Sequence, residues 1–264
     1  MEFTFTTFAW LGAACFLAAF IDSIAGGGGL ISLPAYMAAG IPPHIALGTN
    51  KVAASFSSIS SSLKFWKAGK VNMELMKILV PFSFLGAVIG VRAVLLLDSK
   101  YLYPIALGLL VFTIFYTLMH KNMGDSNEFT GLTKRNITEG IVMALLLGFY
   151  DGFFGPGTGS FLIFLLIRIF RYDFINASGN SKILNLASNI ASVITFIHAG
   201  KVNYIYALSM AIFMFVGAQL GAQFAILRGS KIIKPIFVVV STVVAIKMAS
   251  QFIDFTAIGA FLWR

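Results

Sequence analysis

Gly48-Thr49-Asn50-Lys51, in the first half of the chain, recurs in outline as Gly179-Asn180-Ser181-Lys182 in the second half. A glycine-rich break precedes each stretch, at residues 22–29 and 151–159. The sequence Ala-Gly-Lys-Val-Asn follows each one, at residues 68–72 and 199–203. Because the same motifs occur twice in the same order, the sequence indicates an internal duplication.

The composition of the chain points to a membrane protein. Of its 264 residues, 58% are hydrophobic and only 11% are charged, whereas soluble domains carry about 25% charged residues. The apolar runs are long and rich in Leu, Ile, Phe and Ala, which favours helices over barrel strands of about ten alternating residues. We therefore expect an all-α polytopic membrane protein.

Hydrophobic periodicity predicts helical segments at residues 8–24, 30–40, 45–66, 73–97, 101–120, 137–153, 159–170, 174–198, 203–227 and 232–250. Two of these segments, 30–40 and 159–170, cover only about half the hydrocarbon thickness. Each directly follows a glycine break. Since irregular backbone at membrane depth is tolerated only where it is buried or lines a cavity, each half is expected to contain a Gly-broken or re-entrant helix pair plus three spanning helices.

The chain divides at its one substantial polar stretch. We expect a first transmembrane repeat at residues 1–124, a polar cytoplasmic linker at 125–136, and a second repeat at 137–264. The spacing Gly86-x3-Gly90 matches Gly217-x3-Gly221, a pattern typical of close helix packing.

Charge distribution predicts the topology. With the N-terminus outside, the inside loops collect twelve basic residues: Lys64, Lys67, Lys70, Lys77, Lys121, Lys134, Arg135, Arg168, Arg171, Arg228, Lys231 and Lys234. The outside ends collect four: Arg92, Lys100, Lys201 and Arg264. Both termini are therefore expected outside the cytoplasmic membrane, the inner membrane of the cell. Each half then has an odd number of crossings, so the two repeats are inverted, as in many secondary transporters.

Lys51 and Lys182 are the first candidate site residues. A charge at the bilayer centre costs at least about 2.5–3.5 kcal/mol, so two lysines at equivalent places suggest a function. They are candidate counter-charges for an anion. The alternatives are ion pairs with Asp22 and Asp151, or snorkelling to the membrane surface. The two aspartates are also candidates for proton coupling or for capping a half-helix.

The glycine breaks are the second candidate. They place main-chain N–H groups at the start of each short helix, where the helix dipole is positive and an oxyanion can bind. The alternative is that these glycines only permit tight packing or a kink. The residues concerned are Gly26, Gly27, Gly28, Gly29, Gly155, Gly157, Thr158 and Gly159.

Polar faces follow both lysines. Ser55, Ser58 and Ser62 recur at helical spacing, and so do Asn185, Ser188, Asn189, Ser192 and Thr195. They either line a hydrophilic path or pack helices together. Gln219 and Gln223 are expected to form hydrogen bonds inside the bundle. No motif indicates a metal site, a catalytic nucleophile, a cofactor, an ATP-binding loop or nucleic-acid binding, so we expect no enzyme.

The glycine-rich run into Leu33-Pro34, the stretch at residues 46–51, the stretch Phe65-Trp66-Lys67-Ala68-Gly69-Lys70-Val71 and their second-half counterparts resemble the TauE/SafE sulfite exporter family. The resemblance covers essentially the whole chain. It implies a permease of small sulfur-containing anions such as sulfite, thiosulfate or organosulfonates. It also makes Asn50-Lys51 and Ser181-Lys182, together with the glycine breaks, the positions to test for substrate binding. The second repeat departs from the first, with Pro156 opposite Gly27 and Ser181 opposite Asn50.

The main hypothesis is a secondary transporter, acting as an exporter, with alternating access between the repeats and the anion at mid-membrane. An anion channel on the same scaffold is an alternative, as is a cation-coupled permease of another small solute. A membrane-embedded enzyme or assembly subunit is a further alternative. The sequence leaves the oligomeric state open and permits a homodimer.

Overall fold

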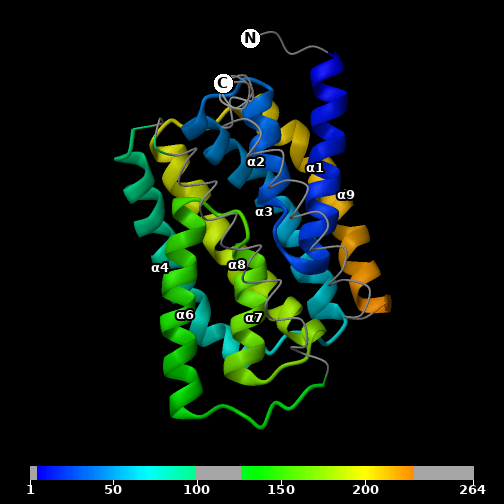
Figure 1. Ribbon diagram of the computed structural model, residues 1–264, viewed down its shortest axis with the longest axis vertical. Helices are drawn as coiled ribbons and strands as arrows, with labels where there is room; N and C mark the ends of the chain where they lie inside the picture. Colours follow the sequence, from blue (N-terminus) through cyan, green and yellow to red (C-terminus); the bar gives the residue numbers. More distant parts are fainter. Residues whose placement is uncertain (1–4, 99–100, 102–125, 229–264) are drawn as a thin grey trace, which may run out of the picture.

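The computed structural model describes residues 5–98, 101 and 126–228, and all its regular elements in these ranges are helices (Figure 1). They are α1 (Phe5–Ala25), α2 (Gly29–Ala38), α3 (Pro43–Lys67), α4 (Met73–Leu95), α6 (Lys134–Phe153), α7 (Thr158–Phe170), α8 (Phe174–His198) and α9 (Tyr204–Arg228). The all-helical prediction is therefore confirmed for the described part. The expected segments at 101–120 and 232–250 fall outside it, apart from residue 101.

Helix lengths separate spanning helices from half-helices. The stretch Phe5–Ile24 of α1, α4 and α9 are each long and apolar enough to cross a membrane. At 25 residues each, α3 and α8 extend about 37 Å, which also exceeds the hydrocarbon thickness. The helices α2 and α7, with 10 and 13 residues, are long enough to cross only about half of the hydrocarbon layer. The two short segments predicted after the glycine breaks are therefore present.

The start of α6 differs slightly from the expectation. The helix begins at Lys134, inside the stretch assigned to the linker. Thr133 and Asn136 explain this boundary, because each side chain accepts a hydrogen bond from the other's main-chain amide, at 3.2 and 2.8 Å. This capping box satisfies two amides of the first turn.

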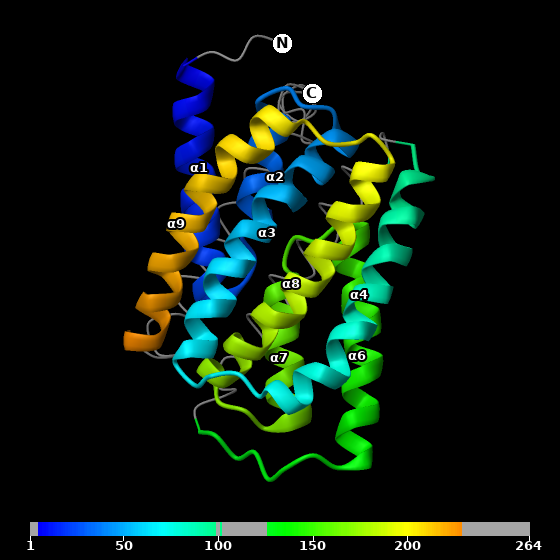
Figure 2. The ribbon, with the colours of Figure 1, turned by 180° about the vertical axis from the view of Figure 1, so that it is seen from behind.

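The helices run in two opposing directions. Viewed as in Figures 1 and 2, α1, α3 and α9 run from the upper end to the lower end, whereas α4, α6 and α8 run upward. The half-helix α2 turns back beside α1, and α7 turns back beside α6. As a result, both half-helices begin near the middle of the molecule.

Glycines allow two helix pairs to approach closely. Gly86 and Gly90 of α4 lie against main-chain carbonyl groups of α6, and Gly217 and Gly221 of α9 lie against those of α1. A Cβ atom at any of the four positions would overlap a carbonyl oxygen. The prediction that both Gly-x3-Gly patterns serve helix packing is therefore confirmed.

The start of α3 is held against the loop between α8 and α9. Gly48 lies directly beneath the main-chain carbonyl of Lys201, where no Cβ atom would fit. Beside it, the amide of Asn203 donates to Thr49 Oγ1 at 3.0 Å. The Gly-Thr of the first lysine motif thus contacts the second Ala-Gly-Lys-Val-Asn sequence.

The start of α8 makes the reciprocal contact with the loop between α3 and α4. Gly179 lies beneath the carbonyl of Lys70, and the amide of Asn72 donates to Asn180 Oδ1 at 2.9 Å. Each lysine motif therefore docks on the loop that follows the other one. This explains why the two motifs recur together in the sequence.

Basic residues gather at the lower end of the described structure, which we call the basic end. It carries the C-terminus of α3, the start of α4, the start of α6, the C-terminus of α7 and the C-terminus of α9. The residues are Lys64, Lys67, Lys70, Lys77, Lys134, Arg135, Arg168, Arg171 and Arg228. At the opposite end lie Arg92 and Lys201. This asymmetry matches the loop assignment made from the sequence.

Two clusters of buried apolar side chains fill the interior, one toward the upper end and one toward the basic end. The upper cluster includes Leu33, Leu47 and Phe196, and the lower one includes Phe65 and Leu166, all of them buried. The interior also buries many polar side chains, among them Asn50, Lys51, Asp151 and Lys182. Burying polar groups is unfavourable unless they are paired, so these residues are candidates for a functional site.

Candidate functional site

The two glycine breaks touch each other at the centre of the bundle. A Cβ atom on Gly26 would lie only 2.9 Å from Gly159 Cα, and one on Gly29 would lie 3.2 Å from Pro156 Cα. Gly26 and Gly157 also have positive φ angles, of 80° and 87°, which side chains with a Cβ rarely adopt. Glycine is required here both by the close approach and by the backbone conformation.

This arrangement brings the N-termini of α2 and α7 to one place. The amide of Gly28 donates to Asp22 Oδ1 at 3.0 Å. Within the described residues, the amides of Gly27, Gly29, Gly157 and Gly159 have no hydrogen-bond acceptor. Two positive helix ends and unpaired N–H groups form a polar surface suited to a negatively charged group.

Lys51 forms a buried ion pair with the break of the other half. Its Nζ lies 2.8 Å from Asp151 Oδ2, with side chains 5% and 3% exposed. The same ammonium donates to Asn189 Oδ1 at 3.1 Å, and Ser188 Oγ donates to Asp151 Oδ2 at 2.6 Å. The pair is thus tied to α8 on both sides.

Lys182 makes the reciprocal pair. Its Nζ lies 2.7 Å from Asp22 Oδ2 and also donates to the Asp22 main-chain carbonyl. The side chain of Lys182 is 1% exposed, whereas that of Asp22 is 19% exposed. Each lysine is therefore paired with the aspartate of the other half, so the formal charges of the four side chains cancel.

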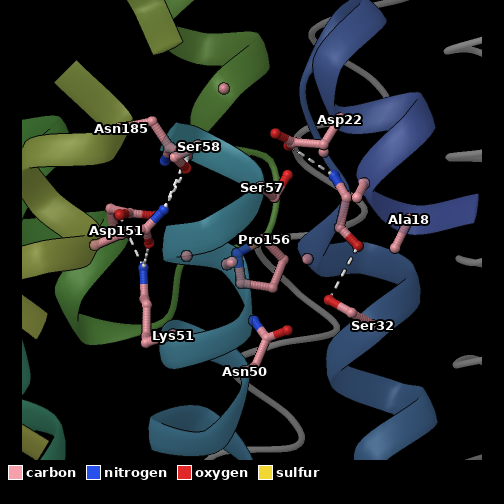
Figure 3. A pocket seen from close by; sticks show the side chains of 18 of the residues that line it. Ala18, Asp22, Ser32, Asn50, Lys51, Ser57, Ser58, Asp151, Pro156 and Asn185 are labelled. Atoms are coloured by element: carbon pink, nitrogen blue, oxygen red, sulfur yellow. Dashed lines mark hydrogen bonds and ion pairs between the residues drawn. The ribbon is translucent and has the colours of Figure 1, made fainter. Parts of the chain in front are cut away.

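A cavity of about 50 Å³ lies between the breaks and helices α3 and α8 (Figure 3). One water needs roughly 10–15 Å³ of such space, so the cavity holds a few waters or one small ion. It is lined by Ala18, Ala19, Asp22, Gly27, Gly28, Gly29, Ser32, Asn50, Lys51, Ala54, Ser57, Ser58, Asp151, Phe154, Gly155, Pro156, Gly157, Gly159, Asn185, Asn189 and Met214.

Asn50 is a cavity residue whose side chain has unfilled hydrogen-bonding capacity. It is buried, and its Oδ1 has no hydrogen-bond partner within the described residues. Because the oxygen and nitrogen of a side-chain amide are interchangeable by rotation, the Asn50 amide can present N–H groups to the cavity. A buried polar group left unpaired costs about 1–3 kcal/mol, which a bound ligand would offset.

A hydrogen-bonded polar network forms the wall of the cavity toward the basic end. Ser58 Oγ donates to Asn185 Oδ1 at 3.1 Å, and Asn189 Nδ2 donates to Ser58 Oγ at 2.9 Å. Asn189 in turn accepts from Lys51. The polar faces noted in the sequence therefore meet here. Other members of those faces, such as Ser192 and Thr195, bond to their own helix backbone.

The cavity brings together most of the residues predicted to bind substrate. Gly27, Gly28, Gly29, Asn50, Lys51, Gly155, Gly157 and Gly159 line it, as do the proton-coupling candidates Asp22 and Asp151. Gly26, Thr158, Ser181 and Lys182 do not line it. Gly26 packs against α7. Thr158, Ser181 and Lys182 are buried, and Ser181 Oγ donates a hydrogen bond to the Ser178 carbonyl at 2.8 Å.

The sequence reasoning missed several lining residues. Ser32 lies one turn into α2, and its hydroxyl donates to the Gly28 carbonyl at 3.2 Å. Ala18, Ala54, Phe154 and Met214 supply apolar walls. Small and apolar residues in apolar helices give no signal of their own. Ser32 could have been predicted to face the cavity, because it lies one helical turn after Gly28 of the glycine break.

The described residues contain no group of three or more His, Cys, Asp or Glu side chains that could hold a metal ion.

Gln219 accepts a hydrogen bond from Ser60 Oγ at 3.0 Å, and Gln223 accepts one from Lys64 Nζ at 3.3 Å. The expectation of hydrogen bonds inside the bundle is confirmed for Gln219, whose contact is partly buried, whereas the contact of Gln223 lies at the exposed surface.

Residues 11–248 match the sequence model of a family described as sulfite exporter TauE/SafE. The chain is 38% identical over 250 residues to probable membrane transporter protein ORF9 of a Sinorhizobium species, covering 95% of each chain. It is 35% identical over 236 residues to probable membrane transporter protein YfcA of Escherichia coli K12, covering 88% of this chain and 86% of that one. No solved structure matches the chain.

A further relative is a probable membrane transporter protein of Haemophilus influenzae, 35% identical over 234 residues, with 88% of this chain and 91% of that protein covered. These relatives are named as transporters rather than enzymes, and the described helices include three that are apolar and long enough to span a bilayer. The chain belongs to the TauE/SafE sulfite exporter family of membrane transporters.

Proposed function

We propose that this protein is a secondary transporter that exports small sulfur-containing anions, such as sulfite or an organosulfonate, across the cytoplasmic membrane. The observation that carries the proposal is the cavity where two half-helix N-termini meet, with glycine amides that have no acceptor among the described residues and the buried side chain of Asn50, whose Oδ1 has none of its hydrogen bonds filled there. Helix N-termini of this kind bind the anionic groups of substrates in transporters with discontinuous helices.

The electrostatics of the cavity favour a small anion over a cation. The crossed pairs cancel the charges of Lys51, Lys182, Asp22 and Asp151. What remains is the partial positive charge of two helix N-termini, equivalent to roughly half an elementary charge each. Both aspartates are already neutralised by lysines, so a cation has no free carboxylate to bind.

Alternating access is supported by the arrangement of the helices. The corresponding helices α1 and α6, α3 and α8, and α4 and α9 run in opposite directions, and the motif contacts are reciprocal. We therefore infer two inverted repeats around the cavity. The apolar clusters on either side would open in turn as one repeat rocks against the other.

The orientation follows from the basic end, which we place in the cytoplasm. The start of α1, at the opposite end of the molecule, would then lie outside, as expected for the N-terminus from the sequence. An inside-negative potential favours anion exit by about 2.3 kcal/mol per charge per 100 mV, so export needs no coupling ion. If protons are coupled, Asp22 is the better candidate of the two aspartates, because both line the cavity but the Asp22 side chain is the more exposed, at 19% against 3%.

The test is a thermal-shift titration of the purified protein in detergent with sulfite, thiosulfate, sulfoacetate, taurine and sulfate. A ligand at a hundred times its Kd stabilises the folded state by about 2.7 kcal/mol, roughly 5–11 °C for a chain of this size. Asn50→Leu should abolish the shift. Ser61→Ala is the matched control, because Ser61 lies on the same helix but bonds to the Ser57 carbonyl and does not line the cavity.

The proposal predicts a saturable shift for at least one sulfur anion that the control retains and Asn50→Leu loses. A shift with Na⁺ or a cationic solute, and none with any anion, would refute the anion site. It would instead support the cation-coupled alternative. Flux that does not saturate with anion concentration would favour the channel.

A further inference from the structure

A second pocket lies at the basic end, away from the central cavity. It has a volume of about 470 Å³, within the range of small-molecule sites. It is formed where the C-terminus of α7 meets the segment before α6 and the first turns of α6. Its lining includes Arg135, Glu139, Arg168 and Arg171.

The lining carries an excess of positive charge. Arg135 is paired with Glu139, with Nε 2.9 Å from Oε1. Arg168 and Arg171 have no ion-pair or hydrogen-bond partner for their guanidinium groups within the described residues. Since Glu139 is the single acidic residue among the described lining residues, two guanidinium charges remain uncompensated in the pocket.

A nearby acidic residue does not neutralise them. The main-chain amide of Glu128 donates to the Arg171 carbonyl at 2.9 Å, which ties the linker to the end of α7. Its carboxylate accepts a hydrogen bond from Ser126 Oγ at 3.1 Å instead of forming an ion pair with Arg171. Arg171 also has a φ of 56°, in the left-handed region that glycine most often adopts at a helix C-terminus.

The pocket adjoins the lipid-facing side of α6. Arg135, Glu139, Val142 and Leu146 follow one another at helical spacing, so they share one face. Val142 and Leu146 are apolar and exposed, at 51% and 61%, as expected for side chains that contact acyl chains. The arginines therefore lie at the level where the headgroups of the bilayer would meet this face.

We propose that this pocket binds the phosphate group of an anionic membrane lipid. Guanidinium groups match phosphate geometry and form charge-assisted hydrogen bonds with it. Basic pockets between helices on the cytoplasmic side are suited to such headgroups. The lipid headgroup is favoured over free phosphate because the pocket opens beside an apolar, membrane-facing surface. The site is separate from the central cavity and does not depend on the transported substrate.

The experiment measures thermal stability of the full chain in detergent micelles containing either phosphatidylglycerol or phosphatidylcholine, and separately with inorganic phosphate. Native mass spectrometry counts the lipids retained. The test variant is Arg168→Gln/Arg171→Gln. The matched control is Lys67→Gln/Lys77→Gln, which removes two exposed charges at the same end of the molecule, outside the pocket.

We expect phosphatidylglycerol to stabilise the wild type and the lysine control. The arginine variant should bind it at least about tenfold more weakly, and Arg168→Lys/Arg171→Lys should recover part of the loss. Equal effects of the arginine and lysine variants would show general surface attraction and overturn the proposal. A shift with inorganic phosphate that phosphatidylglycerol does not reproduce would overturn the lipid as the source. If the double variant is not recovered, Arg168→Gln alone is measured with the same outcomes.

Discussion

Removing one partner of the buried Lys51–Asp151 pair is the most informative perturbation of the fold. In Asp151→Ala the ammonium of Lys51 stays buried, with the Asn189 amide oxygen as its remaining acceptor. Breaking a buried pair in this way costs about 3–5 kcal/mol. For a chain of this size each kcal/mol lowers Tm by about 2–4 °C, so we expect a decrease on the order of 6–20 °C.

The measurement is the apparent Tm of the purified protein in one detergent, for wild type, Asp151→Ala, Lys51→Met/Asp151→Leu and Asp22→Ala. The double variant removes both charges, so it should recover most of the stability. Asp22→Ala should lower Tm less, because the Asp22 side chain is 19% exposed and Lys182 keeps the main-chain carbonyl of residue 22 as an acceptor. A decrease below about 2 °C in Asp151→Ala, or a double variant as unstable as the single one, would refute the buried pairing.

Further predictions follow from single contacts. Gly48→Ala forces a Cβ atom onto the Lys201 carbonyl and should destabilise by about 1–3 kcal/mol, measured by Tm. Asp173→Ala removes the cap that accepts the first-turn amide of α8 at 2.7 Å and should cost about 1 kcal/mol. Lys67→Cys should react with an impermeant maleimide only in inside-out vesicles, and Lys201→Cys only in intact cells; the reverse labelling would invert the topology. Cys15 is buried and should give little background.

Local sequence patterns predicted the elements well because their causes are local. The lengths of α2 and α7 follow from glycine breaks and apolar runs, and the packing of Gly86 and Gly217 follows from their spacing. The start of α6 was placed too late, since Asn136 at the third position of a capping box was not recognised.

The pairing of the charged residues could not be decided from the sequence. Lys51 and Asp151 lie in different halves, and their contact depends on the two breaks meeting at the centre. The same holds for Lys182, for which the sequence left an anion site, an ion pair with an aspartate and snorkelling open: it lies outside the cavity and is paired with Asp22. Such long-range contacts depend on how the two halves pack together. The hydrophobic periodicity of the sequence carries no information about that packing.

The most direct test of the transporter hypothesis is flux in proteoliposomes. Sulfite-loaded vesicles containing wild type, Asn50→Leu or Ser61→Ala are given an inside-negative potential, and sulfite efflux is measured against its concentration. The account predicts saturable efflux that the potential accelerates, that Ser61→Ala retains and that Asn50→Leu loses. Efflux that is unaffected by Asn50→Leu would show that small anions do not pass through the cavity between the two breaks.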